Sequence, residues 1–150
     1  MMIRITDHPF QIADAVAEFE RQSAGAGAIV TFSGLVRPQS AEGDVQTLHL
    51  QAYSPITENG IQQAVDAAQE KWSLSAVRVI HRIGDMAPGD PIVFVATAAP
   101  HRRAAFEAAD FLMDYLKTEA IFWKKEITAS ESRWIEPRAE DYRDRTRWNQ

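Results

Sequence analysis

The chain has 150 residues, of which 45% are hydrophobic and 25% are charged, a composition that predicts one folded domain and excludes an intrinsically disordered protein. Its formal net charge of -5 argues against a general attraction to nucleic acid or to anionic membrane surfaces. The chain contains no cysteine, which excludes disulfides, thiolate metal sites and a cysteine nucleophile, so any sulfur chemistry requires an external donor.

Neither a membrane span nor an export signal is expected. The sequence contains no run of about 18 apolar residues, the length that crosses a bilayer. Its N-terminal stretch carries polar residues every few positions and lacks the apolar segment of a secretory signal. We therefore expect a cytoplasmic protein.

In chain order, the hydrophobic pattern of the first half alternates between strand and helix. Alternating or β-branched apolar runs predict strands, and apolar residues three and four positions apart predict helices. By these criteria strands lie at residues 3–6, 28–36 and 45–53, and helices at residues 12–19 and 57–72. A loop joins the second strand to the third, and Thr57 is a candidate N-cap of the second helix.

The second half continues this alternation. Strands at residues 77–83 and 92–99 flank a turn that contains Gly and Pro, and we expect them to pair antiparallel. Pro100 suits the first turn of a helix, which extends to about Lys117. A last strand is predicted at residues 121–128.

The interspersed helices and hairpins favour one α+β domain over a doubly wound parallel sheet. We expect a two-layer arrangement with a mixed or antiparallel sheet, which spans residues 1–150 without an internal repeat or a linker. The charged tail, about residues 130–150, carries Trp134 and Trp148 as candidate anchors to this domain.

Three of the four lysines cluster near the predicted last strand, whereas lysines that only aid solubility are usually scattered. Alternation places Phe122, Lys124 and Glu126 on one face of this strand and Lys125 on the other, so one lysine shares a face with apolar neighbours. Burial beside another cation such as Lys117 lowers a lysine pKa toward the range used in acid–base or nucleophilic catalysis. The alternative is that both strand lysines extend into solvent from a sheet edge.

A second polar cluster, His101 and Arg102, lies at the start of the predicted third helix. Free backbone N–H groups, the positive end of the helix dipole and the guanidinium group together predict an anion site. The alternative is a solvated polar first turn. Arg37, in the loop after a buried strand, is a third and weaker candidate.

Other chemistries lack support in the sequence. His8, His49 and His81 are dispersed, without the spacing of metal ligands, and we interpret them as surface or structural histidines. Ser33 does not lie in a nucleophile elbow, and the sequence has no Gly-rich phosphate loop. We therefore expect no metal site.

The two polar clusters lie too far apart for one small ligand. If residues 101–117 form one helix, Arg102 and Lys117 are about 22 Å apart along its axis. We therefore expect either an extended ligand or a composite site, in which His101 and Arg102 of one subunit face Lys117 and Lys124 of another.

Three segments carry the most distinctive motifs of the chain. They are TFSGLVR at residues 31–37, VIHRIGDMAPGDPIVFVATAAPHRRAAFEA at residues 79–108, and MDYLKTEAIFWKKE at residues 113–126. In order and spacing these segments resemble the family of molybdopterin synthase large, catalytic subunits. The resemblance extends from about residue 27 to about residue 138.

The resemblance implies an α/β hammerhead fold and a sulfurtransferase of molybdenum cofactor biosynthesis. In that family, cyclic pyranopterin monophosphate receives two sulfurs as a dithiolene, and the sulfur arrives as a thiocarboxylate at the C-terminal Gly-Gly of a small ubiquitin-like subunit. The large subunit forms a homodimer with one small subunit at each end, which makes a heterotetramer. No cofactor is implied, and a chain without cysteine fits an external sulfur donor.

Matched residue by residue, the family's catalytic lysines correspond to Lys117 and Lys124. The resemblance implies that Lys117 assists acid–base catalysis or contacts the partner's terminal carbonyl, and that Lys124 stabilises negative charge or protonates a leaving oxygen. The substrate-binding positions that it implies are Arg37, His101, Arg102, Glu126 and Arg138. The chain departs from the family at Ala52 and Ile56, where many members have a histidine and a methionine.

Two other functions remain open on the residues alone. One is a non-catalytic module that binds an acidic partner tail or a phosphorylated metabolite. The other is a Schiff-base lysine enzyme. The presence of every matched polar residue favours the sulfurtransferase over both.

Overall fold

The computed structural model describes residues 2–40, 43–118, 120, 122–129, 131–135 and 139–149. Its first sheet has the strand order β1 (Ile3–Thr6), β5 (Ala76–Arg82), β7 (Pro91–Ala99) and β2 (Ala28–Leu35). β1 runs parallel to β5, and the other neighbours run antiparallel. The antiparallel pairing predicted for the strands now labelled β5 and β7 is thus confirmed.

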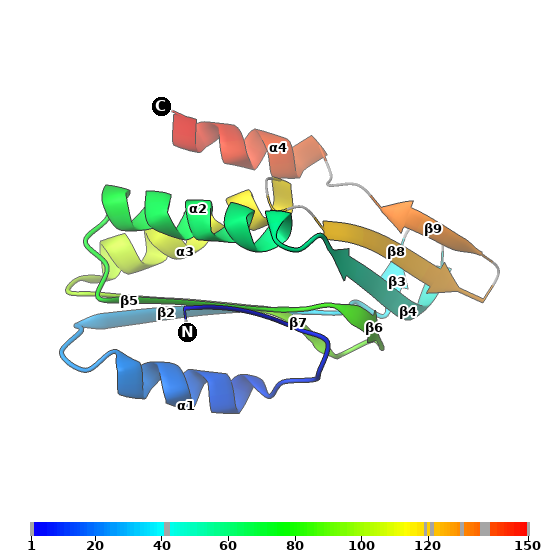
Figure 1. The fold of residues 1–150 in the computed structure, drawn as a ribbon, viewed down its shortest axis with the longest axis horizontal. Helices are drawn as coiled ribbons and strands as arrows, with labels where there is room; N and C mark the ends of the chain where they lie inside the picture. The colour runs from blue at the N-terminus through cyan, green and yellow to red at the C-terminus, as the bar shows by residue number, and fades with distance from the viewer. Residues whose placement is uncertain are drawn as a thin grey trace.

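Helices cover both faces of the first sheet, as Figure 1 shows. α1 (Ile12–Gln22) lies against one face, and α2 (Ile56–Lys71) and α3 (Arg102–Thr118) lie against the other. β5 and β7 are therefore buried on both sides, which explains why β7 is a nearly continuous apolar run. β5 is as deeply buried but also carries the polar side chains Arg78, His81 and Arg82. The predicted α+β class is confirmed.

The second sheet lies beyond the ends of α2 and α3 (Figure 1). Its strand order is β3 (Gln39–Ser40), β4 (Gly43–Ala52), β8 (Phe122–Thr128) and β9 (Ser132–Ile135), and β6 (Gly84–Met86) also pairs with β4. All these pairs are antiparallel. A small apolar cluster that includes Leu48, Leu50 and Met86 packs on this sheet beside the first one.

Four local predictions were wrong, because short segments form elements that hydrophobic periodicity does not reveal. The expected loop after β2 contains β3, and the expected turn after β5 contains β6, because both pair with β4. The strand predicted to be the last one is followed by β9 and by α4 (Ala139–Thr146). Thr57 does not cap α2: it lies in the first turn, where its Oγ1 accepts a hydrogen bond from the Tyr53 N–H at 2.8 Å.

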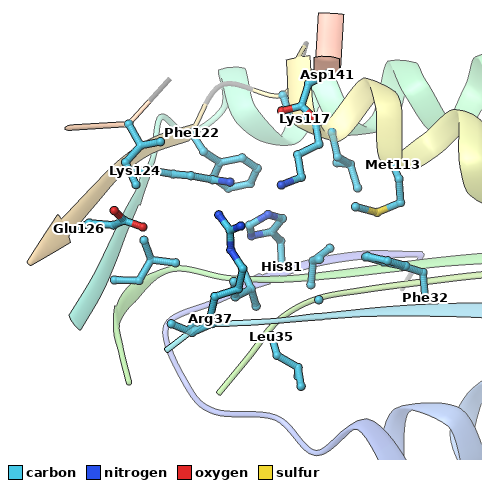
Figure 2. Close-up of a pocket in the computed structure, with 18 of the residues that line it drawn as sticks. Phe32, Leu35, Arg37, His81, Met113, Lys117, Phe122, Lys124, Glu126 and Asp141 are labelled. Atoms are coloured by element: carbon cyan, nitrogen blue, oxygen red, sulfur yellow. The ribbon is translucent and has the colours of Figure 1, made fainter. Parts of the chain in front are cut away.

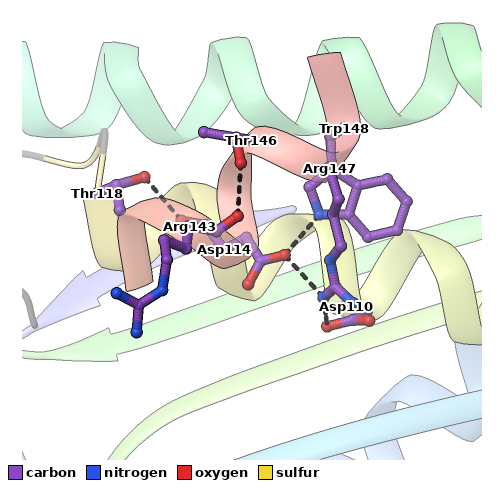
Figure 3. Close-up of polar contacts among 7 residues, drawn as sticks. All are labelled: Asp110, Asp114, Thr118, Arg143, Thr146, Arg147 and Trp148. Carbon is purple, nitrogen blue, oxygen red and sulfur yellow. Dashed lines mark hydrogen bonds and ion pairs between the residues drawn. The ribbon is translucent and has the colours of Figure 1, made fainter. Parts of the chain in front are cut away.

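The C-terminal segment packs on α3, and the predicted anchor Trp148 is part of this contact. The Trp148 ring lies edge-on to Trp72 and Phe111, with ring centroids 5.7 Å apart in both pairs. Asp114, which is buried, accepts hydrogen bonds from the indole N–H of Trp148 and from Arg147 (Figure 3). These contacts hold α4 over the helical layer. The other candidate anchor, Trp134, is half exposed and contacts Trp123 on the outer face of β8.

Candidate active site

A cavity of about 380 Å³ lies where the two sheets meet the last turns of α3. Each surrounding element contributes side chains: β2 and the loop after it, β4, β5, β7, α3, β8, β9 and α4. The polar members of the lining are Arg37, His81, Lys117, Lys124, Glu126 and Asp141. Apolar side chains such as Phe32, Met113 and Phe122 form most of the remaining wall (Figure 2). A small polar ligand fits a cavity of this size.

The alternation of β8 decides which of its side chains reach the cavity. Phe122, Lys124 and Glu126 line it, as the sequence predicted, whereas Lys125 lies on the opposite face. There the Lys125 ammonium is 5.5 Å from the centroid of the Trp134 ring. The two adjacent lysines therefore occupy different environments, and only Lys124 belongs to the cavity.

Three cationic groups from separate segments converge in the cavity. Lys117 comes from the last turn of α3, Lys124 from the middle of β8, and Arg37 from the loop after β2. Figure 2 shows their nitrogen atoms pointing toward one another across the cavity. Like charges at close range repel, so this arrangement is costly unless an anion occupies the space between them.

Burial sets the protonation of Lys124. Desolvation, and after it the charge of Lys117, lower the pKa of Lys124 from 10.5 to about 8. Asp141 and Glu126 oppose this shift, and Arg37 adds to it. At pH 7, an amine with a pKa of about 8 is neutral in roughly one molecule in ten, so both of its protonation states are available for catalysis.

Two carboxylates complete the ring of charges. Glu126 is only 8% exposed, and within the described residues its Oε1 has no hydrogen-bond partner. A buried carboxylate oxygen without a partner is costly, which indicates that a ligand or an ordered water bonds to it. Asp141 of α4 also lines the cavity and acts on the charge of Lys124. The sequence reasoning did not identify Asp141, because nothing local in the tail indicates where α4 packs.

His81 is the other residue that sequence reasoning missed. It lies on β5, is 6% exposed, and lines the cavity, where Figure 2 shows the Arg37 guanidinium beside it and the Lys117 and Lys124 side chains above it. Burial is the main reason that its pKa falls from 6.5 to about 4, and the charges of Lys124 and Lys117 contribute. A signal was available in the sequence, since alternation places His81 on the same face of its strand as the core residues Val77 and Val79.

Comparison with known proteins identifies the family. The family model described as MoaE protein matches residues 5–119. This chain belongs to the MoaE family.

Its relatives in this family match it over nearly the whole chain. It is 47% identical to the molybdopterin synthase catalytic subunit of Vibrio cholerae over 97% of each chain, and 46% identical to that of Caulobacter vibrioides over 100% and 99%. Among solved structures, a MoaE protein from Burkholderia ambifaria superposes with a TM-score of 0.84 at 37% identity, covering 99% of this chain and 98% of the other. Molybdopterin synthase from Staphylococcus aureus gives a TM-score of 0.82 at 30% identity over 90% and 97%. The resemblance found in the sequence motifs is thus confirmed.

The remaining candidate residues of this MoaE-family chain lie apart from the cavity. His101 and Arg102 are exposed at the first turn of α3, whereas Lys117 lies in its last turn, so one chain does not bring the two clusters together. Arg138 lies outside the described residues. His8 and His49 are paired with the neighbouring carboxylates of Asp7 and Asp85 rather than with the cavity.

Neither a metal site nor a membrane-spanning helix is found in the described part of this MoaE-family chain. No three histidine, aspartate or glutamate side chains within it are grouped closely enough to hold a metal ion. Among the described helices, none is both long and apolar enough to cross a membrane.

Proposed function

We propose that the cavity is the site at which this chain transfers sulfur to cyclic pyranopterin monophosphate to form molybdopterin. The sulfur comes from the terminal thiocarboxylate of a small ubiquitin-like subunit with a C-terminal Gly-Gly. The observation that carries the proposal is the convergence of Arg37, Lys117 and Lys124 in one partly apolar cavity. Both the phosphate of the substrate and the thiocarboxylate of the donor are anions. Three converging cations can bind both anionic groups at the same time.

Each cation has a distinct role in this proposal. Arg37 is exposed at the cavity mouth and suits the phosphate, which a guanidinium binds through two hydrogen bonds. Lys124 is the buried amine with the lowered pKa, and as an ammonium it donates a proton to the oxygen that leaves the substrate. Lys117 faces it from α3 and stabilises negative charge on the terminal carbonyl of the donor. No metal or organic cofactor takes part.

We also propose that the site is completed by a second copy of the chain. β2 is an edge strand of the first sheet, and three of its large apolar residues, Ile29, Phe32 and Leu35, are 40%, 42% and 49% exposed. Phe106, near the start of α3, is 61% exposed. An exposed apolar edge strand is a typical surface for pairing with another chain. Because Phe32 and Leu35 also line the cavity, this surface reaches the site itself.

The geometry of β2 explains how such a dimer completes the site. The start of β2 lies next to the start of α3. Ala28 pairs with Ala99, and Gly27 approaches Pro100 so closely that a Cβ on it would lie 2.1 Å from the Pro100 carbonyl oxygen. His101 and Arg102 follow Pro100 directly and therefore lie at this end of β2. The cavity lies at the other end, about 23 Å along the strand. Antiparallel pairing of two β2 edges about a two-fold axis therefore places the anion site of one copy beside the cavity of the other. With one small subunit at each cavity, the assembly is a heterotetramer.

A single-turnover assay tests the catalytic proposal. The protein is mixed with cyclic pyranopterin monophosphate and a thiocarboxylated small subunit, and the dithiolene product is measured for the wild type, Lys117→Ala and Lys125→Ala. We expect product from the wild type and from Lys125→Ala, which changes a lysine outside the cavity, and little from Lys117→Ala. A stable complex of the wild type with the small subunit that yields no product would show a binding module instead.

Mixing two inactive variants tests the composite site. Lys117→Ala and Arg102→Ala each damage both sites of their own homodimers, but a mixed dimer regains one intact site. If the site is shared, random exchange restores about a quarter of the wild-type activity. Mixtures that stay as inactive as the separate variants, although exchange is verified by mass, would contradict a shared site.

A further inference from the structure

The ring of His81 is held in one orientation. It stacks on Phe122 of β8 with ring centroids 4.0 Å apart and an interplanar angle of 20°. The stacked pair connects the first sheet to the second sheet, and Figure 2 shows both side chains in the lining of the cavity. Since only 6% of His81 is exposed, its ring cannot turn freely.

One hydrogen bond defines the tautomer of His81. Its Nδ1 lies 3.0 Å from the backbone carbonyl oxygen of Arg82. A carbonyl oxygen only accepts hydrogen bonds, so Nδ1 carries the hydrogen. In a neutral ring Nε2 is then unprotonated and offers a lone pair. In the part of the chain that the structure describes, no hydrogen bond to Nε2 is formed.

Burial, and after it the surrounding positive charges, keep the His81 ring neutral. Lys117 faces it from α3, Lys124 from β8 and Arg37 from the loop after β2, and protonation would add a fourth positive charge to this group. Glu126 and Asp141 are the carboxylates of the same cavity lining. Burial and the two lysines hold the pKa of His81 at about 4, so the ring is neutral at pH 7.

A hydrogen-bond acceptor without negative charge is rare in this cavity. The three cations only donate hydrogen bonds, and the carboxylates accept them but repel an anionic ligand. Among the side chains of the described lining, the imidazole of His81 accepts a hydrogen bond without carrying negative charge. We infer that Nε2 of His81 accepts a hydrogen bond from an N–H or O–H group of the substrate and thereby selects an anion that also carries such a donor.

This inference rests on the proposed function, and three variants separate it from a structural role. His81→Gln keeps an acceptor near the position of Nε2 but loses the stacked ring. His81→Phe keeps the stacked ring but loses the acceptor. His81→Asn keeps a donor for the Arg82 carbonyl and also loses the acceptor. KM and kcat are measured for each with cyclic pyranopterin monophosphate and the thiocarboxylated small subunit.

The order of the KM values of the three variants distinguishes hydrogen bonding to the substrate from a structural role. An unpaired substrate donor should raise KM about tenfold or more in His81→Phe and His81→Asn, with kcat little changed, while His81→Gln stays within about threefold of the wild type. A purely structural residue would give the opposite order, because His81→Phe preserves the packing. That result, or equal KM values for all variants, overturns the inference.

Nitrogen-15 NMR of the wild-type protein provides a test that needs no turnover. We expect Nε2 of His81 to have the shift of an unprotonated nitrogen, and this shift to move when cyclic pyranopterin monophosphate is added. A protonated Nε2, or one that the bound substrate leaves unchanged, refutes the inference even in an active enzyme. A wild type that binds the substrate and shifts Nε2 but forms no product refutes the proposed function alone.

Discussion

Removing the charge of Lys117 should raise the pKa of Lys124. We consider Lys117→Met, which keeps most of the length of the side chain and deletes only the ammonium group. The pKa of Lys124 is lowered from 10.5 to about 8, first by burial and next by Lys117. A lowered pKa disfavours the ammonium form, so deletion of the second-largest cause must move the pKa upward.

The size of the change follows from the order of these causes. The fall from 10.5 to about 8 corresponds to about 3 kcal/mol against the ammonium form of Lys124. Burial is the largest contribution and persists in the variant, so the pKa should rise by roughly one pH unit and stop well below 10.5. The neutral fraction at pH 7 then falls from roughly one in ten to one in a hundred.

Carbon-13 NMR of lysine side chains measures this pKa directly. The chain has only four lysines, so the Cε signals of Lys71, Lys117, Lys124 and Lys125 can be assigned by single substitutions. Each variant is titrated from about pH 6 to about pH 11, which covers both the lowered and the ordinary lysine pKa. The measurement is independent of activity, which Lys117→Met is expected to lose for its own reasons.

Two matched variants make the result decisive. Lys125→Met removes a neighbouring ammonium group on the opposite face of β8 and should leave the pKa of Lys124 near 8. Asp141→Asn removes a charge that favours the ammonium form, so it should lower the pKa of Lys124 further. If Lys117→Met leaves the pKa unchanged, or if Lys125→Met moves it as far, the electrostatic description of the cavity is wrong.

Three further predictions concern stability. The lowered pKa of Lys124 destabilises the folded state at every pH below about 8. Lys124→Met should therefore stabilise the fold at pH 7 by up to about 3 kcal/mol, although it abolishes activity. Calorimetry should show this gain as a higher Tm. The buried neutral His81 should cost stability as pH falls from 6.5 through about 4, and denaturant titrations of His81→Gln should lack this loss. Asp114→Ala should expose the C-terminal segment to trypsin and cost about 1–3 kcal/mol, whereas Asp110→Ala, which removes a more exposed partner of Arg147, should cost less than about 1 kcal/mol. Equal effects of the last two substitutions would show that Asp114 does not anchor the tail.

The sequence alone was sufficient wherever a structure depends on neighbouring residues. Hydrophobic periodicity located the long strands and the first three helices, because alternating or helical spacing determines which face of an element is buried. The same alternation correctly separated Lys124 from Lys125, since adjacent residues of a strand point to opposite faces. The length of the predicted third helix also showed that Arg102 and Lys117 cannot share one small ligand.

The tertiary structure decided what depends on contacts between distant segments. β6 is too short to be recognised by periodicity and exists because the distant β4 offers hydrogen bonds to it. Asp141 enters the cavity because Arg147 and Trp148 fasten the tail to α3, a contact that no local pattern encodes. His81 became a candidate functional residue only when Lys117, Lys124 and Arg37, each from a different element, were seen to surround it. Periodicity predicts which face of an element is buried, whereas the packing of elements determines which groups meet there, and the pKa of each group follows from those neighbours.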